Sequence, residues 1–265
     1  MSENAKIPVL SLSGGMDSSA LLLHTLAGFA EEPVYAVSFN YGQRHSLELE
    51  RLDKNLELLR TKGFKIHHTL IDLQGIGNLF HSSLTTAGWN PPEGHYAEES
   101  MKETVVPNRN AIFSSVIYGY ALSIAQRENR EAVICLGVHS GDHAVYPDCR
   151  PEFYDSIGKS FAIGNWDSEK VSFYLPYLDG DKESILRDAY NSCLQLSVDF
   201  YEYFKNTNTS YDPDEAGRAS GKTGSDIERI LAFNALGVKD PVEYQEPWDV
   251  VVERALEMEK RHQND

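Results

Sequence analysis

The stretch Leu12–Leu26, which reads LSGGMDSSALLLHTL, carries the residues best suited to hold an anion. Its two adjacent glycines allow close backbone approach, and the amides of a turn that opens a helix attract negative charge. Three serines, Ser13, Ser18 and Ser19, add hydroxyl donors. No lysine follows the second glycine, as the common nucleoside triphosphate loop requires, and the G-x-G-x-x-G pattern of dinucleotide-binding turns is absent. The stretch indicates a phosphate site of another type, with a plain glycine turn between strand and helix as the alternative.

Alternating strands and helices must position this stretch. Strands are predicted at short apolar runs, and helices where apolar residues recur at helical spacing. The predicted strands are Ile7–Leu12, Pro33–Phe39, Ile66–Ile71, Ala132–Gly137 and Val171–Leu175. The predicted helices are Ser18–Leu26, Leu47–Lys62, Asn110–Gln126, Pro151–Ala162, Glu183–Ser192 and Asp226–Leu236. This order predicts an α/β fold with a parallel sheet and right-handed crossovers.

Two long segments interrupt the alternation. Residues 72–103 are rich in glycine, serine, proline and acidic residues, and irregular stretches of that length are usually functional loops or lids. Residues 206–225 form a polar segment, and a tail of mixed charge follows Trp248.

The charge and the cysteines narrow the class of protein. A formal net charge of −16 over 265 residues argues against nucleic acid as a partner, because such binding needs clustered lysine and arginine. Cys135, Cys149 and Cys193 form no C-x-x-C pair, which argues against a disulfide framework or a cysteine-built zinc site. The N-terminal residues show no signal peptide pattern, and the apolar runs are too short to cross a bilayer. We expect a cytoplasmic protein without a membrane partner.

Six further motifs follow the opening stretch in a fixed order. They read FNYGQRHSLELE (39–50), SSLT (82–85), VVPNRN (105–110), VYPDCRPEF (145–153), DKESI (181–185) and GVKDPVEY (237–244). The S-G-G-x-D-S stretch resembles the pyrophosphatase loop of PP-loop ATPases, and from Val9 to Tyr244 the ordered motifs resemble the QueC family of 7-cyano-7-deazaguanine synthases. The resemblance implies a five-stranded, doubly wound parallel sheet of the PP-loop type in residues 1–190. It implies a small helical subdomain in residues 191–265.

The resemblance also implies a mechanism of carboxylate activation. The carboxylate of 7-carboxy-7-deazaguanine attacks the α-phosphate of ATP to give an acyl adenylate and pyrophosphate. Ammonia then forms the amide, and a second ATP drives dehydration to the nitrile. Fixed donors around the phosphates would stabilise the developing charge. The implied ATP-binding residues are Ser13, Gly14, Gly15, Met16, Asp17, Ser18, Ser19, Phe39 and Gly137.

Three of the implied residues carry charge. Lys182 and Arg109 are expected near the phosphates, and the alternative for each is a solvated surface cation. Asp17 cannot bind phosphate without repulsion, so we expect it to hold Mg²⁺ or to fix the amides of the loop, with helix capping as the alternative. ATP and Mg²⁺ are the expected cofactors.

A second group of residues is implied for the deazaguanine. Tyr146 offers an aromatic face, Asp148 can accept from the adjacent N–H donors of a guanine edge, and Arg150 adds a guanidinium. The full set is Tyr41, Gln43, Arg44, His45, Asn110, Asp142, Tyr146, Asp148 and Arg150. The histidines on either side of Asp142, His139 and His143, suggest a metal site as one alternative. No fourth ligand is evident in the sequence, so we interpret them as ordinary loop residues.

The chain departs from the family pattern near its C-terminus. Family members carry four cysteines there that bind structural zinc, and the corresponding positions in this chain are Ser210, Ser220, Thr223 and Asp226. Neutral hydroxyls are poor zinc ligands and one carboxylate cannot hold the ion alone, so we expect no zinc. Hydrogen bonding and packing must then offset the loss. The segment from Glu246 to Asp265, with an amphipathic run over 250–258, is expected to serve as a buttress or as a dimer contact.

We therefore expect an ATP-dependent ligase that adenylates 7-carboxy-7-deazaguanine and couples it to an amine. The amine is ammonia in synthesis of the cyano base. It is the amino terminus of a partner protein in the QueC-like proteins of bacterial antiviral systems. One alternative is another PP-loop amide former, such as an NAD or GMP synthetase, although YGQRH and YPDCR do not belong to those families. A non-catalytic scaffold that binds nucleotide is the other.

Overall fold

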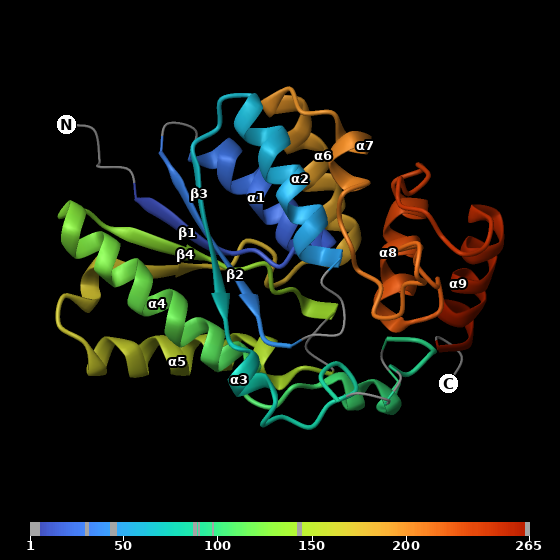
Figure 1. Cartoon of the computed structure of the whole chain (residues 1–265), viewed down its shortest axis with the longest axis horizontal. Helices are drawn as coiled ribbons and strands as arrows, with labels where there is room; N and C mark the ends of the chain where they lie inside the picture. The colour runs from blue at the N-terminus through green and yellow to red at the C-terminus, as the bar shows by residue number, and fades with distance from the viewer. Residues whose placement is uncertain are drawn as a thin grey trace.

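A sheet of five parallel strands, in the order β3-β2-β1-β4-β5, runs through the centre of the molecule (Figure 1). The computed structural model describes residues 6–29, 32–42, 47–86, 89, 91–96, 98–141 and 145–262. The strands are β1 (Ile7–Ser11), β2 (Val34–Asn40), β3 (Ile66–Asp72), β4 (Ala132–Cys135) and β5 (Val171–Tyr174). Val9 of β1 lies opposite Tyr35 of β2 on one side and Ile134 of β4 on the other. The predicted α/β fold with a parallel sheet is confirmed.

Helices cover both faces of the sheet, and strand side chains alternate between them. Leu10 of β1 packs with the leucines of α1, whereas Ile7 and Val9 pack with Ile117 of α4. The first face is covered by α1 (Met16–Gly28), α2 (Leu47–Thr61) and α6 (Lys182–Leu196), and the second by α4 (Arg109–Glu128) and α5 (Pro151–Gly164) (Figure 1). The six predicted helices therefore include each of these five.

The strand order reverses beside β1. From β1 the chain continues outward to β2 and β3, and it then returns to place β4 on the other side of β1. In an open α/β sheet the carboxyl ends of the strands diverge at such a reversal and leave a crevice where ligands bind. The fold therefore places a binding crevice directly at the opening stretch, which follows β1.

The long segment 72–103 is more ordered than its composition predicts. It contains α3 (Gln74–Gly77), and the 3-10 helix η1 (Glu99–Thr104) closes it. Two shorter 3-10 helices follow, η3 (Pro147–Cys149) and η4 (Ser168–Lys170). The amide of Gly94 donates to the carbonyl of Lys222 at 3.1 Å, and His95 Nε2 lies 3.0 Å from Glu259 Oε2. The described part of the segment is thus tied to the C-terminal helices.

Three helices complete the C-terminal part: α7 (Phe200–Phe204), α8 (Gly224–Ala235) and α9 (Trp248–His262). The sequence analysis did not predict α7, which is only one turn long. Val251 and Ala255 of α9 pack against Ile227 and Ile230 of α8, which is the contact expected of a buttress (Figure 1). Phe233 of α8 belongs to the same apolar cluster as β1 and α1. A domain boundary at residue 190 stays a prediction.

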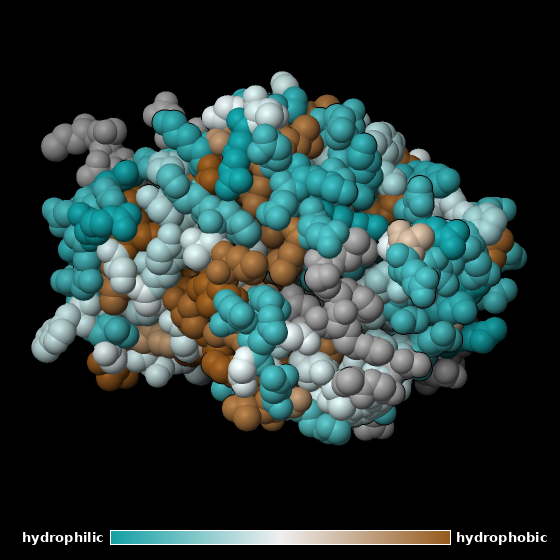
Figure 2. Space-filling view, viewed as in Figure 1, coloured by the Kyte–Doolittle hydropathy of each residue, from teal (hydrophilic) through white to brown (hydrophobic). Residues whose placement is uncertain are grey.

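Apolar side chains reach the surface along the edge strand β3. Figure 2 shows them gathered in the middle of the viewed face. Leu70 is 50% exposed, and beyond the strand Ile76 and Leu79 are 39% and 80% exposed. The predicted homodimer has no test in a single chain and stays a prediction. No helix within the described ranges is long and apolar enough to span a membrane.

Candidate active site

A cavity of about 270 Å³ opens at the carboxyl ends of β1, β2 and β4. Ser11 and Leu12 at the end of β1, Phe39 and Tyr41 at the end of β2, and residues 136–138 after β4 line it. Twelve of the predicted site residues share this lining: Ser13, Gly15, Met16, Asp17, Ser18, Phe39, Tyr41, Arg109, Asn110, Gly137, Tyr146 and Lys182. Predicted residues from the opening stretch and from four of the six further motifs therefore meet in one place.

The serine-rich loop is a tight turn held by its own side chains. The amides of Ser13 and Gly14 both donate to Ser18 Oγ at 3.2 Å, and the Gly15 amide donates to Ser13 Oγ at 3.3 Å. Gly14 has a φ of +91°, and a Cβ there would lie 2.7 Å from the carbonyl oxygen of Glu48. Only glycine fits this position without strain. The loop is therefore held in shape by its own hydrogen bonds and by the backbone conformation of Gly14.

Gly14 and Ser19 lie behind the lining rather than in it. The carbonyl of Gly14 accepts from the amide of Asn208 at 3.1 Å, and Ser19 is buried in the first turn of α1. Both residues therefore support the loop from the protein side. Gly137 approaches the start of α1, since a Cβ there would lie 3.4 Å from the carbonyl oxygen of Asp17.

Asp17, Lys182, His139 and Glu228 form a charged cluster at one side of the cavity. Lys182 Nζ lies 3.0 Å from Asp17 Oδ2 and 3.4 Å from Glu228 Oε2, and His139 Nε2 lies 3.9 Å from Asp17 Oδ2. Lys182 is only 9% exposed, so it is not a solvated surface cation. Burial alone would raise the pKa of Asp17, but Lys182 and His139 outweigh it and the net shift is downward. Asp17 stays ionised at neutral pH.

The second oxygen of Asp17 has no hydrogen-bond partner within the described structure, although it is buried. The helix-capping alternative is not seen, because the N-cap of α1 is Gly15 and no side chain caps it. Fixing the loop amides is the task of Ser18 rather than Asp17. A buried, ionised carboxylate oxygen without a donor is suited to a hard divalent cation, so the site fits Mg²⁺.

Arg109 and a group of aromatic rings form another wall. Arg109 opens α4, its Nε donates to Asn110 Oδ1 at 3.3 Å, and its Cζ lies 5.9 Å from the centroid of the Tyr146 ring. Phe39 stacks on Phe113, with 4.1 Å between the ring centroids. Flat apolar faces beside a guanidinium suit a planar heterocycle next to an anionic group.

Two residues predicted to contact the deazaguanine also lie outside the cavity lining. Asp148 Oδ2 accepts from the amide of Asn110 at 3.2 Å, so this carboxylate fixes the first turn of α4. Arg150 is exposed at the N-cap of α5. The structure brings Tyr146 to the cavity but not these neighbours, and their contact with a base stays a prediction. Four predicted residues, Gln43, Arg44, His45 and Asp142, lie outside the described residues, as does His143.

The cavity also includes residues that the sequence analysis did not predict. Glu48, Asn208 and Tyr211 line it, and His139 and Glu228 complete the charged cluster. Glu48 lies inside the motif FNYGQRHSLELE, so the motif itself was the available signal. The others come from loops and from α8, and no local pattern distinguishes them from ordinary polar residues.

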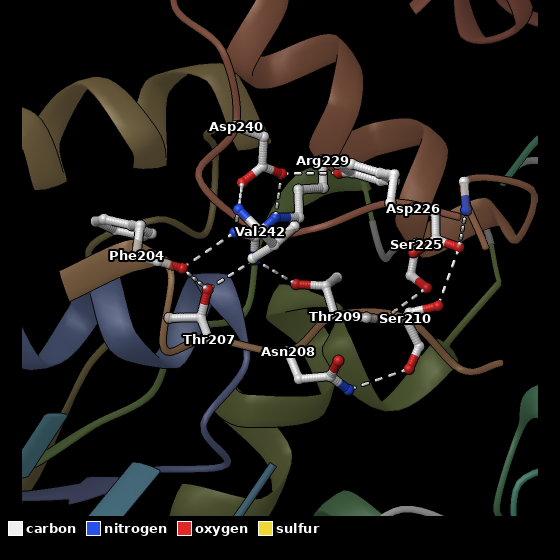
Figure 3. Close-up of polar contacts among 12 residues, drawn as sticks. Phe204, Thr207, Asn208, Thr209, Ser210, Ser225, Asp226, Arg229, Asp240 and Val242 are labelled. Carbon is white, nitrogen blue, oxygen red and sulfur yellow. Dashed lines mark hydrogen bonds and ion pairs between the residues drawn. The ribbon is translucent and has the colours of Figure 1, made fainter. Parts of the chain in front are cut away.

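The four positions that replace the zinc cysteines come together around the carboxylate of Asp226. Figure 3 labels two of them, Ser210 and Asp226. Asp226 Oδ2 accepts from Ser210 Oγ at 3.1 Å, from Ser220 Oγ at 2.8 Å and from the Gly221 amide at 3.0 Å. Thr223 caps α8 by accepting from the Asp226 amide at 3.3 Å. We call these four residues the Asp226 hub. Within the described ranges no group of three or more His, Cys, Asp or Glu side chains could hold a metal ion.

A buried ion pair adjoins the Asp226 hub (Figure 3). Arg229 Nε and Nη2 donate to the two oxygens of Asp240 at 2.6 and 2.9 Å, and both side chains are at most 2% exposed. Arg229 Nη1 also donates to the hydroxyls of Thr207 and Thr209, at 2.8 and 3.0 Å. Between these two threonines lies Asn208, whose amide donates to the Gly14 carbonyl of the serine-rich loop, so α8 is connected to that loop through one short segment.

A family model described as "Queuosine biosynthesis protein QueC" matches residues 7–237. The chain belongs to the QueC family. It is 41% identical over 237 residues to the 7-cyano-7-deazaguanine synthase of Caldicellulosiruptor saccharolyticus, covering 89% of this chain and 95% of that relative. It is 41% identical over 243 residues to the enzyme of the same name from Psychromonas ingrahamii, covering 91% and 99% of the two chains. The QueC match ends before α9 begins.

Solved structures give weaker likenesses. The U34-tRNA thiolase NcsA from Methanococcus maripaludis has a TM-score of 0.42 and 13% identity, covering 97% of this chain and 73% of that one. The NMN synthetase from Francisella tularensis has a TM-score of 0.39 and 15% identity, covering 97% and 85%. These likenesses add no functional argument to the QueC membership.

Proposed function

We propose that this protein is an ATP-dependent ligase that adenylates 7-carboxy-7-deazaguanine and couples the activated carboxylate to an amine. The observation that carries the proposal is the shared cavity. The serine-rich loop, the cations Lys182 and Arg109, and the aromatic wall all face one space at the switch point of the sheet. The 7-cyano-7-deazaguanine synthases among the relatives supply the substrate class.

In this proposal the phosphates of ATP lie against the start of α1. The first amides of a helix have no partner within the helix and donate to anions. Lys182 and Arg109 balance the negative charge that grows on the phosphates as the carboxylate attacks. Their fixed positions remove the need for reorganisation during the reaction, because Lys182 is already held between Asp17 and Glu228.

Asp17 Oδ1 would hold Mg²⁺ in this arrangement. The cation would supply further charge neutralisation on the phosphates when bound. The residues Ser13, Gly15, Met16, Ser18, Phe39 and Gly137 remain our proposed ATP contacts, whereas Gly14 and Ser19 would support the loop from behind.

The aromatic wall would receive the deazaguanine. Tyr146 and the stacked pair of Phe39 and Phe113 offer flat faces, and Tyr41 and Asn110 add polar atoms within the same lining. The remaining proposed contacts are Gln43, Arg44, His45, Asp142, Asp148 and Arg150.

The name of the relatives favours ammonia as the amine, because their product carries a cyano group. A cyano group has one nitrogen with no other substituent, and ammonia supplies such a nitrogen. A protein amino terminus is the second candidate. It is favoured by the divergence of the four cysteine positions and by α9, which lies beyond the QueC match. A nucleotide-binding scaffold is the third.

The test follows AMP and the products by mass spectrometry after incubation with ATP and 7-carboxy-7-deazaguanine, with and without ammonium. AMP that depends on the carboxylate supports the ligase. An amide and a nitrile that appear with ammonium support cyano synthesis, and an amide alone supports conjugation. ATP binding without AMP formation under any condition supports the scaffold and overturns the ligase.

A further inference from the structure

Glu48 is a carboxylic acid in the first turn of α2 that faces the cavity. Its backbone lies against the phosphate loop, since a Cβ on Gly14 would come within 2.7 Å of the Glu48 carbonyl oxygen. Its side chain hydrogen bonds to Asn208, whose amide in turn binds the loop at Gly14. Glu48 is therefore held beside the position proposed for the phosphates, although no phosphate contact suits a carboxylate.

The amide-forming step needs a proton acceptor. An amine attacks through its lone pair, and it must lose a proton to become an amide. Among the described lining residues only Asp17 and Glu48 carry carboxylates, and none is a histidine. Asp17 is ionised by its contact with Lys182 and its pKa is lowered, so it is a weak base. Of these two carboxylates, Glu48 is the better proton acceptor.

The surroundings of Glu48 suit this task. Burial raises the pKa of Glu48 to about 7, against the opposing effects of the Asn208 hydrogen bond and of Arg109. The groups that face it are Arg109 from α4 and the phenol of Tyr41 after β2. Arg51, on the same helix, donates instead to the carbonyls of Thr207 and Gly217. A base is most effective when its pKa lies near the working pH.

We infer that Glu48 is the catalytic base of the coupling step, accepting a proton from the amine nitrogen as that nitrogen attacks the acyl carbon of the adenylate. The C–N bond forms, the bond from the acyl carbon to the phosphate oxygen breaks, and AMP leaves with the electron pair. Glu48 then releases the proton to solvent. The inference rests on the proposed function, and it holds for ammonia and for a protein amine alike.

The test separates the two half-reactions in the full-length protein. Exchange of labelled pyrophosphate into ATP, dependent on 7-carboxy-7-deazaguanine, reports adenylation. Amide formation with ammonium reports coupling. Glu48→Gln keeps the size and the Asn208 contact but cannot accept a proton, so we expect exchange within about threefold of wild type and coupling lowered by roughly 10²- to 10⁴-fold. Glu50→Gln, an exposed change on the same helix, is the matched control and leaves both rates unchanged.

The dependence of the coupling rate on pH distinguishes a base from a residue that only supports the structure. Loss of a purely structural contact at Glu48 would lower the rate without changing the shape of the pH profile. Wild-type coupling, plotted against free amine, rises with pH and levels off near the Glu48 pKa of about 7. The rise of the coupling rate with pH is expected to disappear in Glu48→Gln. In Glu48→Asp the rise is expected to remain, with lower rates throughout. Hydroxylamine is largely unprotonated at neutral pH. With hydroxylamine as the amine, we expect a smaller difference in coupling rate between wild type and Glu48→Gln.

Three results would overturn the inference. Equal loss of exchange and coupling in Glu48→Gln, with unchanged thermal unfolding, would show that Glu48 serves adenylation. A raised KM for the carboxylate alone would show that it binds the base. An unchanged rise of the coupling rate with pH would show that another group accepts the proton. Absence of exchange in the wild type would instead overturn the proposed ligase, and the inference with it.

Discussion

Gly14 shows at the scale of one residue how the site constrains the sequence. Its φ of +91° and its contact with the Glu48 carbonyl leave no room for a side chain. Gly14→Ala is therefore expected to lower the free energy of unfolding by about 1–3 kcal/mol and to reduce carboxylate-dependent AMP formation. Gly28→Ala is the control, because it ends the same helix in open space and should stabilise by about 0.5–1 kcal/mol. Urea denaturation of both variants measures the difference, and equal stabilities would contradict the strain argument.

Lys182 carries the electrostatic part of the proposal. Lys182→Gln removes the positive charge that lies between Asp17 and Glu228. Loss of one fixed donor to a developing oxyanion costs about 10²- to 10³-fold in rate, and we expect that loss in pyrophosphate exchange. Lys205→Gln, at an exposed pair with Glu202, is the control and should have no effect. Pyrophosphate exchange at the wild-type rate in Lys182→Gln would show that Lys182 does not stabilise the phosphates.

At the scale of elements, α8 is anchored by the pair of Arg229 and Asp240. Removing one member leaves the other charge buried, so Arg229→Ala is expected to cost about 3–5 kcal/mol of unfolding free energy. Arg187→Ala breaks an exposed pair with Glu183 and should cost less than about 1 kcal/mol. Chemical denaturation compares the two variants. A cost below about 1 kcal/mol for Arg229→Ala would show that the segment carrying Asn208 is held by other contacts.

The packing of α9 on α8 allows a comparison of adjacent residues. Val251 is fully buried and Val250 is 37% exposed. Val251→Asp places a charge among Ile227 and Ile230 and should cost about 3 kcal/mol, whereas Val250→Asp should change stability by less than about 0.5 kcal/mol. Thermal unfolding of the two variants checks the buttress. Equal melting temperatures would mean that α9 does not support α8.

The same scale shows what the sequence could predict. Apolar periodicity and β-propensity are local properties, so the sequence was enough to predict the five strands and the helices that cover them. It also placed the serine-rich loop after β1, although phosphate binding by that loop stays a prediction. Glu228 and Asn208 reach the cavity only because α8 and segment 207–209 fold back onto the start of α1. That approach is decided by packing between distant elements and leaves no local pattern. Asp148 failed to reach the lining for a similar reason, because its carboxylate fixes the start of α4.

For the whole molecule, metal content and stability should be independent. The Asp226 hub satisfies its donors within the protein, so removal of metal by a chelator is expected to leave the melting temperature unchanged. Asp226→Ala leaves those buried donors unsatisfied and should cost about 1–3 kcal/mol. Zinc at one equivalent in the purified protein, together with unfolding by the chelator, would contradict this prediction.

The pH dependence of stability follows from the same hub. Burial raises the pKa of Asp226 above 3.8, although its hydrogen bonds oppose the shift. The folded state then binds the proton more tightly than the unfolded chain, so this contribution is greatest below the unfolded pKa and is lost as pH rises through the folded one. The raised pKa of Glu48 likewise makes the folded state less stable as pH rises to about 7. Asp226→Asn cannot ionise, and its denaturation free energy should decline less than that of wild type across this range. Parallel curves would contradict the raised pKa.

The Asp226 hub has a consequence for the conditions under which the fold survives. A site made of hydroxyls and one carboxylate has no thiolate to oxidise. The three cysteines are all buried, and burial raises the pKa of Cys135 and Cys193 to about 12, which keeps those two thiols protonated. Zinc starvation and oxidant exposure unfold structures held by thiolate-bound zinc, and we expect both to leave this C-terminal region folded.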